Sequence, residues 1–270
     1  MYELFKEGLA RVVLVDNHCK DGVKELISSS YPWVTYKASP KNLGFGYGCN
    51  LGFSIFDSEY TLFLNPDAVI NKEEINKLVN FLEVSTCADM VGPATKVRSG
   101  WQRAGMMPTP SIFKRHDEHF NGRIIEPNKK PFETNWLCGA ILLIRSRVFK
   151  SIGGFDERFF LYFEETDLCK RLRENDYQIW AIGQAIAEHP GGESSKDSDE
   201  LKISGCIAEH YYKSKFYFFK KHYGWLRAVL VEIADVAVIF LRGIKKAILL
   251  KRSPFKEFLA RIKHDFFSMP

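Results

Sequence analysis

Three carboxylates stand close together at the start of a predicted helix, where they have the chemistry of acids and bases. Glu164, Glu165 and Asp167 follow an aromatic-rich segment and precede a helical pattern that runs through Arg173. One interpretation is N-terminal capping, because the helix macrodipole favours anions at that end. The other is that one of the carboxylates faces a ligand crevice and acts as a general base. The residues alone leave both interpretations open.

A second group of polar residues follows buried strands. Asn65, Pro66 and Asp67 come directly after the apolar run 60–64. A carboxylate at a strand end is a suitable ligand for a hard divalent cation that carries a diphosphate, although Asn-Pro-Asp is also an ordinary turn sequence. His189 follows another apolar strand and can bind a metal or a phosphate, whereas a lone histidine is more often structural.

The stretch 42–52 is rich in glycine but matches neither of the common phosphate loops. Cys49 and Leu51 occupy the positions where a dinucleotide-binding fingerprint needs its third glycine, and the chain has no Gly-Lys-Ser/Thr sequence. The glycines still permit close approach of the backbone to a neighbour. The stretch is therefore either a ligand-binding loop or a tight loop at a helix start.

Alternating strand and helix signals surround these groups and indicate an α/β fold with a largely parallel sheet. Strands are predicted at 12–15, 33–37, 60–64 and 136–144, and helices at 23–30, from Asn71 onward and at 164–173. Glu74 stands at the capping-box position of the helix that Asn71 begins. Residues 98–135 are polar and are predicted to form a long loop or flap. In such a fold, the carboxyl ends of the strands deliver side chains to a ligand crevice.

The composition excludes several classes of protein. With 270 residues and 46% hydrophobic content, the chain can bury enough apolar surface to offset its ordering entropy, so it is not a disordered polymer. Its six cysteines are at least 30 positions apart, which argues against a zinc ribbon or a thioredoxin-type site. Free thiols in a cytosolic protein are the simpler expectation.

The C-terminal segment differs from the rest in charge. Residues 211–270 hold 13 Lys and Arg against 4 Asp and Glu, whereas acidic residues are in slight excess before them. From Trp225 to Leu250 the pattern is helical, with a wide apolar face beside a basic stripe and no uncharged run long enough to span a bilayer. Such a helix lies in a membrane interface or packs on its own domain. The alternative for the basic segment is a solvated tail, and no nucleic-acid module accompanies it.

These motifs occur in a familiar order. The order is Val15-Asp16-Asn17, the 42–52 stretch, Leu64-Asn65-Pro66-Asp67, Gly139-Ala140, Gly153-Gly154-Phe155-Asp156-Glu157, Phe160-x-Tyr162-x-Glu164-Glu165-x-Asp167-Leu168-Cys169-x-Arg171 and His189-x-Gly191-Gly192. Over residues 10–225 the chain resembles the family 2 glycosyltransferases, in particular the rhamnosyltransferase-like branch that builds bacterial surface polysaccharides such as O-antigen. The resemblance implies a GT-A fold, a nucleotide-diphosphate sugar donor and inversion at the anomeric carbon.

The same resemblance implies a role for each motif. Glu165 is the predicted catalytic base, at a position where relatives usually carry Asp, and Asp67 and His189 are the predicted ligands of Mg²⁺ or Mn²⁺. The predicted donor-binding residues are Asp16, Asn17, Asn42, Gly44, Asn50 and Asn65. The predicted acceptor or sugar pocket consists of Trp136, Gly139, Glu164 and Asp167.

Relatives carry a further strand ahead of this pattern, and only 14 residues precede Val15, so that first strand is predicted to be missing. We expect a GT-A-like domain at 1–224 and a basic, amphipathic helical tail at 225–270. The expected function is transfer of a sugar, with rhamnose as the first candidate, to a lipid-linked or saccharide acceptor. The expected place is the cytoplasmic face of the cell membrane, with the tail on its anionic surface. The alternative is a catalytically impaired relative that binds a saccharide or a partner protein.

Overall fold

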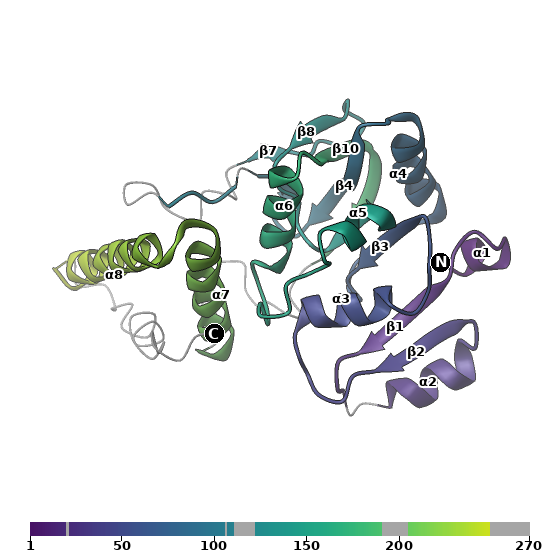
Figure 1. The fold of residues 1–270 in the computed structure, drawn as a ribbon, viewed down its shortest axis with the longest axis horizontal. Coiled ribbons are helices and arrows are strands. Elements are labelled where there is room, and N and C mark those ends of the chain that lie inside the picture. The colour runs from purple at the N-terminus through teal and green to yellow at the C-terminus, as the bar shows by residue number, and fades with distance from the viewer. Residues whose placement is uncertain (20–21, 106, 111–121, 191–204, 249–270) are drawn as a thin grey trace.

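The computed structural model describes residues 1–19, 22–105, 107–110, 122–190 and 205–248, and it shows helices around a central sheet with two C-terminal helices beside it (Figure 1). The elements are α1 (Tyr2–Lys6), β1 (Val12–Asp16), α2 (Val23–Ser30), β2 (Val34–Ala38), α3 (Phe45–Phe53), β3 (Tyr60–Leu64), α4 (Lys72–Val84), β4 (Ala88–Val97), β5 (Gly100–Trp101), β6 (Arg103–Ala104), β7 (Arg123–Ile124), β8 (Phe132–Thr134), β9 (Ile141–Arg145), α5 (Ser146–Ser151), α6 (Glu164–Glu174), β10 (Gln178–Glu188), α7 (Gly205–Tyr223) and α8 (Trp225–Ile248). This order confirms the expected α/β class.

The main sheet is mixed, which corrects the expectation of a largely parallel one. Its strand order is β3-β9-β4-β10-β8, with β5 paired to β4. Only β4 and β10 run parallel within it, whereas β9 runs antiparallel to both of its neighbours. The residues of β9 are buried along almost the whole strand. A strand covered on both faces has the same uninterrupted apolar sequence in either direction, so the pattern did not reveal the orientation of β9.

β4 is a central strand that the sequence pattern did not predict. It contains Pro93, and proline is rare inside sheets because it has no N–H to donate. The proline is accommodated at a β-bulge, where the partner strand β10 shifts register between Ile182, opposite Pro93, and Ile186. The freed N–H of Ile186 donates to the Glu74 carboxylate at 2.6 Å. Glu74 therefore ties α4 to the sheet, while Asn71 caps α4 as predicted, by accepting the Glu74 N–H at 3.0 Å.

β1 and β2 form a separate parallel pair. Within the described part of the chain, β1 has only β2 as a hydrogen-bonded neighbour, and β3 has only β9. The glycine-rich helix α3 covers β1, because a Cβ on Gly52 would lie 3.1 Å from the Val15 side chain. The absence of a strand ahead of β1 stays a prediction, as does the domain division after residue 224.

Residues 98–135, predicted as a loop or flap, hold the short strands β5, β6, β7 and β8. Residues 106 and 111–121 of this segment lie outside the described residues.

The C-terminal helices rest on the sheet domain through aromatic packing. Phe216, Phe218 and Phe219 of α7 are buried in one cluster with Phe159 and Phe163, which precede α6. α8 then packs on α7 and extends away from the sheet (Figure 1). None of the helices described here has both the length and the hydropathy of a membrane-crossing segment.

Candidate active site

The two predicted metal ligands meet at one edge of the main sheet. Val69 and Glu188 exchange both of their backbone hydrogen bonds, at 2.7 and 2.9 Å. This bridge joins the segment after β3 to the end of β10, so Asp67 and His189 become neighbours. The Asp67 Oδ1 atom lies 3.1 Å from the His189 Nε2 atom, and both side chains are partly exposed. A carboxylate and an imidazole from two different strand ends therefore converge on one accessible point.

Asn65 lies two residues before Asp67 and offers a further oxygen. Its backbone N–H donates to the carbonyl oxygen of Ala140 at 2.9 Å, which joins the end of β3 to the residues ahead of β9. Its side-chain Oδ1 atom is buried and has no hydrogen-bond partner among the described residues. A buried amide oxygen without a donor is unusual, and it marks a position where a ligand can complete the bonding.

Glu164 and Glu165 begin α6, and their surroundings differ. Glu164 is buried, and its Oε2 atom has no partner among the described residues. Burial, together with the neighbouring charge of Glu165, raises the pKa of Glu164 well above its ordinary value. Glu165 is partly exposed, and burial raises its pKa to about 7. Of the two, Glu165 is the carboxylate that can exchange a proton with a bound molecule.

A glycine lies against the Cβ atom of each of the two glutamates. A Cβ on Gly139 would lie 3.2 Å from the Cβ of Glu165, and a Cβ on Gly46 would lie 3.7 Å from the Cβ of Glu164. The Gly139 segment leads into β9, and Gly46 lies in the first turn of α3. Three separate parts of the chain therefore meet at the start of α6, where Gly139 lies beside Glu165.

Trp136 positions this helix start rather than lining an open pocket. Its side chain is buried, and its Nε1–H donates to the Thr166 hydroxyl at 3.0 Å. Because Thr166 directly follows Glu165, the bond fixes the first turn of α6 to the segment ahead of β9. This contact was not foreseen, since Thr166 shows no sequence signal.

Asp16 is the last residue of β1, and hydrogen bonds hold its carboxylate in place. It accepts hydrogen bonds from the Tyr36 hydroxyl at 2.5 Å and from the Cys19 N–H at 2.6 Å. The Tyr36 bond is the main cause that holds the pKa of Asp16 below its ordinary value. A fixed carboxylate at this strand end is suited to accept hydrogen bonds from a polar ligand. Tyr36, on the neighbouring strand β2, was missed by the sequence analysis.

Asn17 and Asn42 hold the loop that enters α3. The Asn17 side chain donates to the Gly44 carbonyl oxygen at 2.9 Å and accepts the Leu43 N–H at 3.2 Å. The Asn42 Oδ1 atom accepts the Gly44 N–H at 3.1 Å. Both predicted donor-binding amides thus shape the glycine-rich loop beside Asp16.

Gly44 is required at its position for two reasons. Its φ angle is +95°, and a Cβ there would lie 2.2 Å from the carbonyl oxygen of Phe160. That same oxygen accepts the Phe45 N–H at 3.1 Å, so the loop cannot move away without losing a bond.

We expect Gly44→Ala to lower the free energy of unfolding by more than about 2 kcal/mol, through backbone strain and steric overlap. Urea unfolding measures this loss. Gly8→Ala is the matched control, since Gly8 also has a positive φ but has open space around it. Equal losses in both variants would contradict the steric account.

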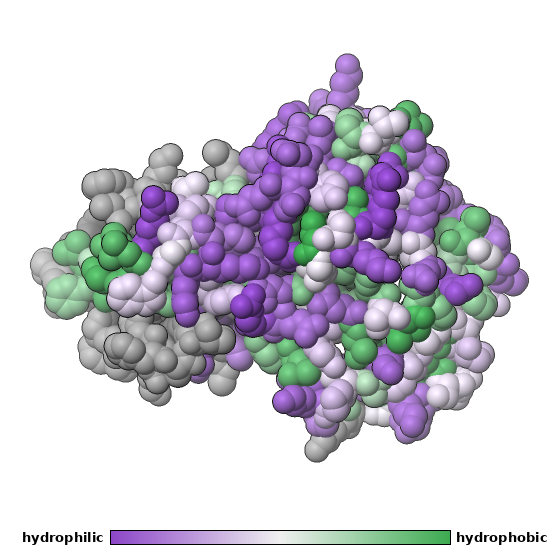
Figure 2. Space-filling view, in the orientation of Figure 1, coloured by the Kyte–Doolittle hydropathy of each residue, from purple (hydrophilic) through white to green (hydrophobic). Residues whose placement is uncertain are grey.

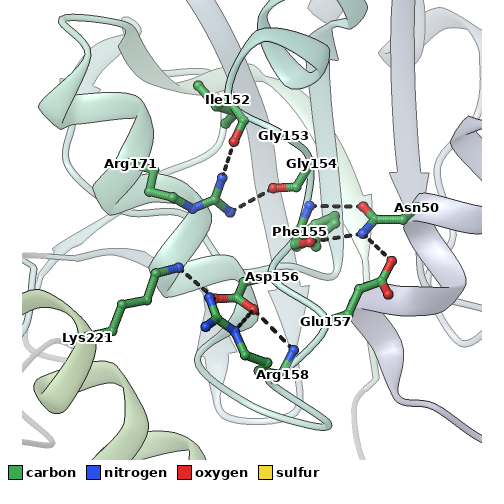
Figure 3. A pocket seen from close by; sticks show the side chains of 10 residues that line it. All are labelled: Asn50, Ile152, Gly153, Gly154, Phe155, Asp156, Glu157, Arg158, Arg171 and Lys221. Atoms are coloured by element: carbon green, nitrogen blue, oxygen red, sulfur yellow. Dashed lines mark hydrogen bonds and ion pairs between the residues drawn. The ribbon is translucent and has the colours of Figure 1, made fainter. Parts of the chain in front are cut away.

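Asn50 holds a turn ahead of α6. Its side chain accepts the Phe155 N–H and donates to the Phe155 carbonyl oxygen, both at 2.9 Å. From the other side, the Arg171 guanidinium donates to the carbonyl oxygens of Ile152 and Gly154 at 2.7 Å (Figure 3). These residues line an open hollow of about 360 Å³. The amide of Asn50 is occupied by the main chain, so this geometry favours a positioning role over the predicted contact with the donor.

Asp167 belongs to the contact between α6 and α7. Its side chain is fully buried and pairs with Arg171 at 2.7 Å, Lys221 at 2.5 Å and His222 at 2.8 Å. Burial alone would raise the pKa of Asp167, but these partners hold it below its ordinary value. The geometry favours a structural role for Asp167 over the predicted place in the sugar pocket. Lys221 and His222 lie in the basic region 211–270 but ahead of the tail that was predicted at 225–270.

Known proteins resemble this chain in sequence and in fold. The family model "Glycosyl transferase family 2" matches residues 4–153. N-acetylglucosaminyl-diphospho-decaprenol L-rhamnosyltransferase of Mycobacterium tuberculosis is 25% identical over 253 residues, which cover 84% of this chain and 80% of that protein. Low-salt glycan biosynthesis hexosyltransferase Agl10 of Haloferax volcanii is 32% identical over 180 residues, which cover 64% of this chain and 56% of that protein.

Among solved structures, mannosyltransferase PcManGT from Pyrobaculum calidifontis, in complex with GDP-Man and Mn²⁺, superposes with a TM-score of 0.56. The match covers 97% of this chain and 79% of that chain, at 11% sequence identity. This likeness confirms the expected GT-A fold.

Proposed function

Because the chain belongs to glycosyl transferase family 2, we propose that this glycosyltransferase moves one sugar, with inversion, from a nucleotide-diphosphate sugar to a lipid-linked or saccharide acceptor. Rhamnose is the first candidate for the sugar, since the Mycobacterium tuberculosis relative is named as a rhamnosyltransferase. The name of that relative also supports a diphospho-polyprenol carrier in the acceptor. Such an acceptor would bring the enzyme to the cytoplasmic face of the membrane.

The observation that supports this proposal best is that candidate cation ligands and a candidate base are connected through the same strand ends. Asp67 and His189 present ligand atoms on the side of the strand ends. Glu165 presents a partly exposed carboxyl group with a raised pKa at the start of α6. The hydrogen bond between Asn65 and Ala140 and the contact between Gly139 and Glu165 connect the two sides. Transfer of a sugar needs an anion stabiliser for the leaving diphosphate and a base for the acceptor.

The donor set fits a divalent cation. A carboxylate oxygen and an imidazole nitrogen are both ligands that divalent cations accept, and the Asp67 oxygen and the His189 nitrogen lie 3.1 Å apart on partly exposed side chains. Asp67 and His189 would hold Mg²⁺ or Mn²⁺, which when bound neutralises charge that develops on the leaving diphosphate. The unpartnered oxygen of Asn65 lies close by in the sequence, and we assign it to donor binding.

The residues around the glycine-rich loop are suited to the nucleoside part of the donor. Asp16 is an anion held in place by Tyr36, and it can accept hydrogen bonds from the hydroxyl or amide groups of a nucleoside. Asn17 and Asn42 fix the backbone of the loop next to it. A preorganised loop binds without paying the entropy of its own ordering.

Glu165 completes the reaction on the acceptor side. In its ionised form it accepts the proton of the acceptor hydroxyl while that oxygen bonds to the anomeric carbon and the diphosphate leaves. The hydrogen bond that Trp136 donates to Thr166 and the ion pair between Lys221 of α7 and Asp167 hold the first turn of α6 in place.

The pH dependence of kcat/KM follows from the state of Glu165. The base acts when ionised, and its pKa is raised to about 7. We therefore expect kcat/KM to rise about tenfold per pH unit below pH 7 and to level off above it. Initial rates between pH 5 and pH 9 measure this profile. A rate that is flat across pH 6–8 would contradict the assignment.

The proposal is tested by titrating the purified full chain with nucleoside diphosphates and their sugars in the presence and absence of Mn²⁺. Calorimetry should reveal at least one nucleotide sugar whose binding requires the cation. That donor should then release its nucleoside diphosphate when a diphospho-polyprenol saccharide is added. Failure of all nucleotide ligands to bind would refute a transferase function and favour the alternative of a saccharide- or partner-binding relative.

A further inference from the structure

Helix α8 turns an apolar stripe away from the protein. Toward α7 it presents Ala228, Val231 and Ile239, which are buried. On the opposite side, large apolar side chains remain between 47% and 65% exposed: Leu226, Leu230, Ile233, Phe240 and Leu241. Their spacing of three, four and seven places them along one side of the helix, and we call this set the outer stripe. Figure 2 shows hydrophobic residues gathered over the part of α8 furthest from the sheet.

The charges of α8 are divided between its faces. Glu232 and Asp235 are the acidic residues of its sequence, and both are turned toward the protein. Glu232 is buried, and Asp235 pairs with the buried Lys215 at 2.5 Å. The helix therefore presents no carboxylate of its own beside the outer stripe.

The basic residues of this region complement an anionic surface. Arg227 is exposed, and the helix sequence contains three more basic residues near its end, Arg242, Lys245 and Lys246. A basic helix with an exposed apolar stripe and with its carboxylates turned away from that stripe is typical of segments that lie in a membrane interface.

We propose that the outer stripe of α8 inserts into the interface of an anionic membrane, with the basic residues of the helix on the lipid headgroups. Apolar side chains that are 47–65% exposed to water would move into the boundary between headgroups and acyl chains. Each basic residue would be attracted by the anionic lipids. This contact does not depend on the transferase function, because it uses no residue of the active site.

A second copy of the chain is a less suitable occupant of the stripe. Pairing two outer stripes would cover the apolar residues, but it would offer no carboxylate to the exposed Arg227, because both acidic residues of α8 are turned toward the protein. An anionic lipid surface satisfies both the apolar side chains and the cations.

The test is flotation of the full chain with vesicles of phosphatidylcholine alone and of phosphatidylcholine with phosphatidylglycerol. We expect binding to the anionic vesicles that weakens as salt is raised, and little binding to the neutral ones. The double variant Leu230→Glu/Ile233→Glu should bind the anionic vesicles at least about tenfold more weakly.

The matched control is Leu26→Glu/Val84→Glu. It makes the same chemical change at exposed apolar residues on α2 and α4 and should bind like the unchanged chain. Should the first double variant fail to fold by circular dichroism, Leu226→Gln/Phe240→Gln tests the same stripe without added charge and should also bind more weakly.

Three results would overturn the proposal. They are the absence of binding to anionic vesicles, an equal loss in the control variant, and undiminished binding by the folded stripe variants. A chain that binds no vesicles but sediments as a dimer, and becomes monomeric in Leu230→Glu/Ile233→Glu, would assign the stripe to a second copy instead.

Discussion

Turnover should fall by about 10²–10⁴-fold in Glu165→Gln, while donor affinity stays within about twofold of the unchanged chain. Glutamine keeps the shape of the side chain but cannot accept a proton from the acceptor hydroxyl. Donor binding is assigned to other residues at the strand ends, so it should not depend on this proton. Initial rates with saturating acceptor and calorimetric titration with the donor separate the two effects.

The neighbours of Glu165 provide internal controls. Glu164→Gln replaces a buried carboxyl group whose ionisation is disfavoured by burial and by the neighbouring Glu165, so turnover should change little. Asp167→Asn breaks the buried pairing with Lys221 and Arg171 and should lower the free energy of unfolding by about 3–5 kcal/mol. If Glu164→Gln abolishes turnover in a folded chain and Glu165→Gln does not, the base is Glu164. If neither matters, the carboxylates only cap α6, and the non-catalytic alternative gains support.

The elements that sequence predicted best are those whose signals are local. The helix 23–30 and the strand 60–64 were predicted with the bounds that the structure shows, because turn residues and apolar runs delimit them. Asn71 was identified as an N-cap because it lies only three residues before Glu74, whose N–H donates to its side chain. β4 escaped prediction because Pro93 is tolerated only through a bulge in the partner strand β10, and the sequence of β4 holds no information about that partner.

The difference between Glu164 and Glu165 also required the fold. Both are acidic, adjacent and at a helix start, so the sequence gives them the same chemistry. Glu164 lies beside Gly46 of α3 and Glu165 lies beside Gly139, and these glycines are more than 90 positions apart in the chain. Motif order predicted that the groups would meet. It could not predict which carboxyl group would stay accessible.

The role of Asp167 also depends on residues that are distant in the sequence. A sequence pattern assigned it to the sugar pocket together with its neighbours. Its partners Lys221 and His222 lie 54 and 55 positions further along, in helix α7, where the sequence pattern showed only an excess of basic residues. The aromatic run 216–219 of the same helix is buried against Phe159 and Phe163, which precede α6.

The second large effect is expected at the cation site. Asp67→Asn should weaken Mn²⁺-dependent donor binding by at least about 100-fold, since removing a ligand should cost at least as much as altering its support, which costs 10–100-fold. Asparagine keeps the size of the side chain, and a partly exposed residue after a strand contributes little packing, so the melting temperature should stay within about 2 °C. Calorimetry of the donor with and without Mn²⁺ measures the loss.

His189→Gln tests the partner ligand, which lies 3.1 Å from Asp67. Loss of the imidazole should weaken binding with Mn²⁺ more than with Mg²⁺, because Mg²⁺ prefers oxygen ligands and depends less on nitrogen. Asp57→Asn serves as the matched control: it makes the same chemical change as Asp67→Asn at an exposed position ahead of β3 and should leave donor binding unchanged. Full Mn²⁺-dependent binding in Asp67→Asn would remove this residue from the site. Equal losses with both cations in His189→Gln would show that the histidine acts by orienting Asp67 rather than by holding the cation.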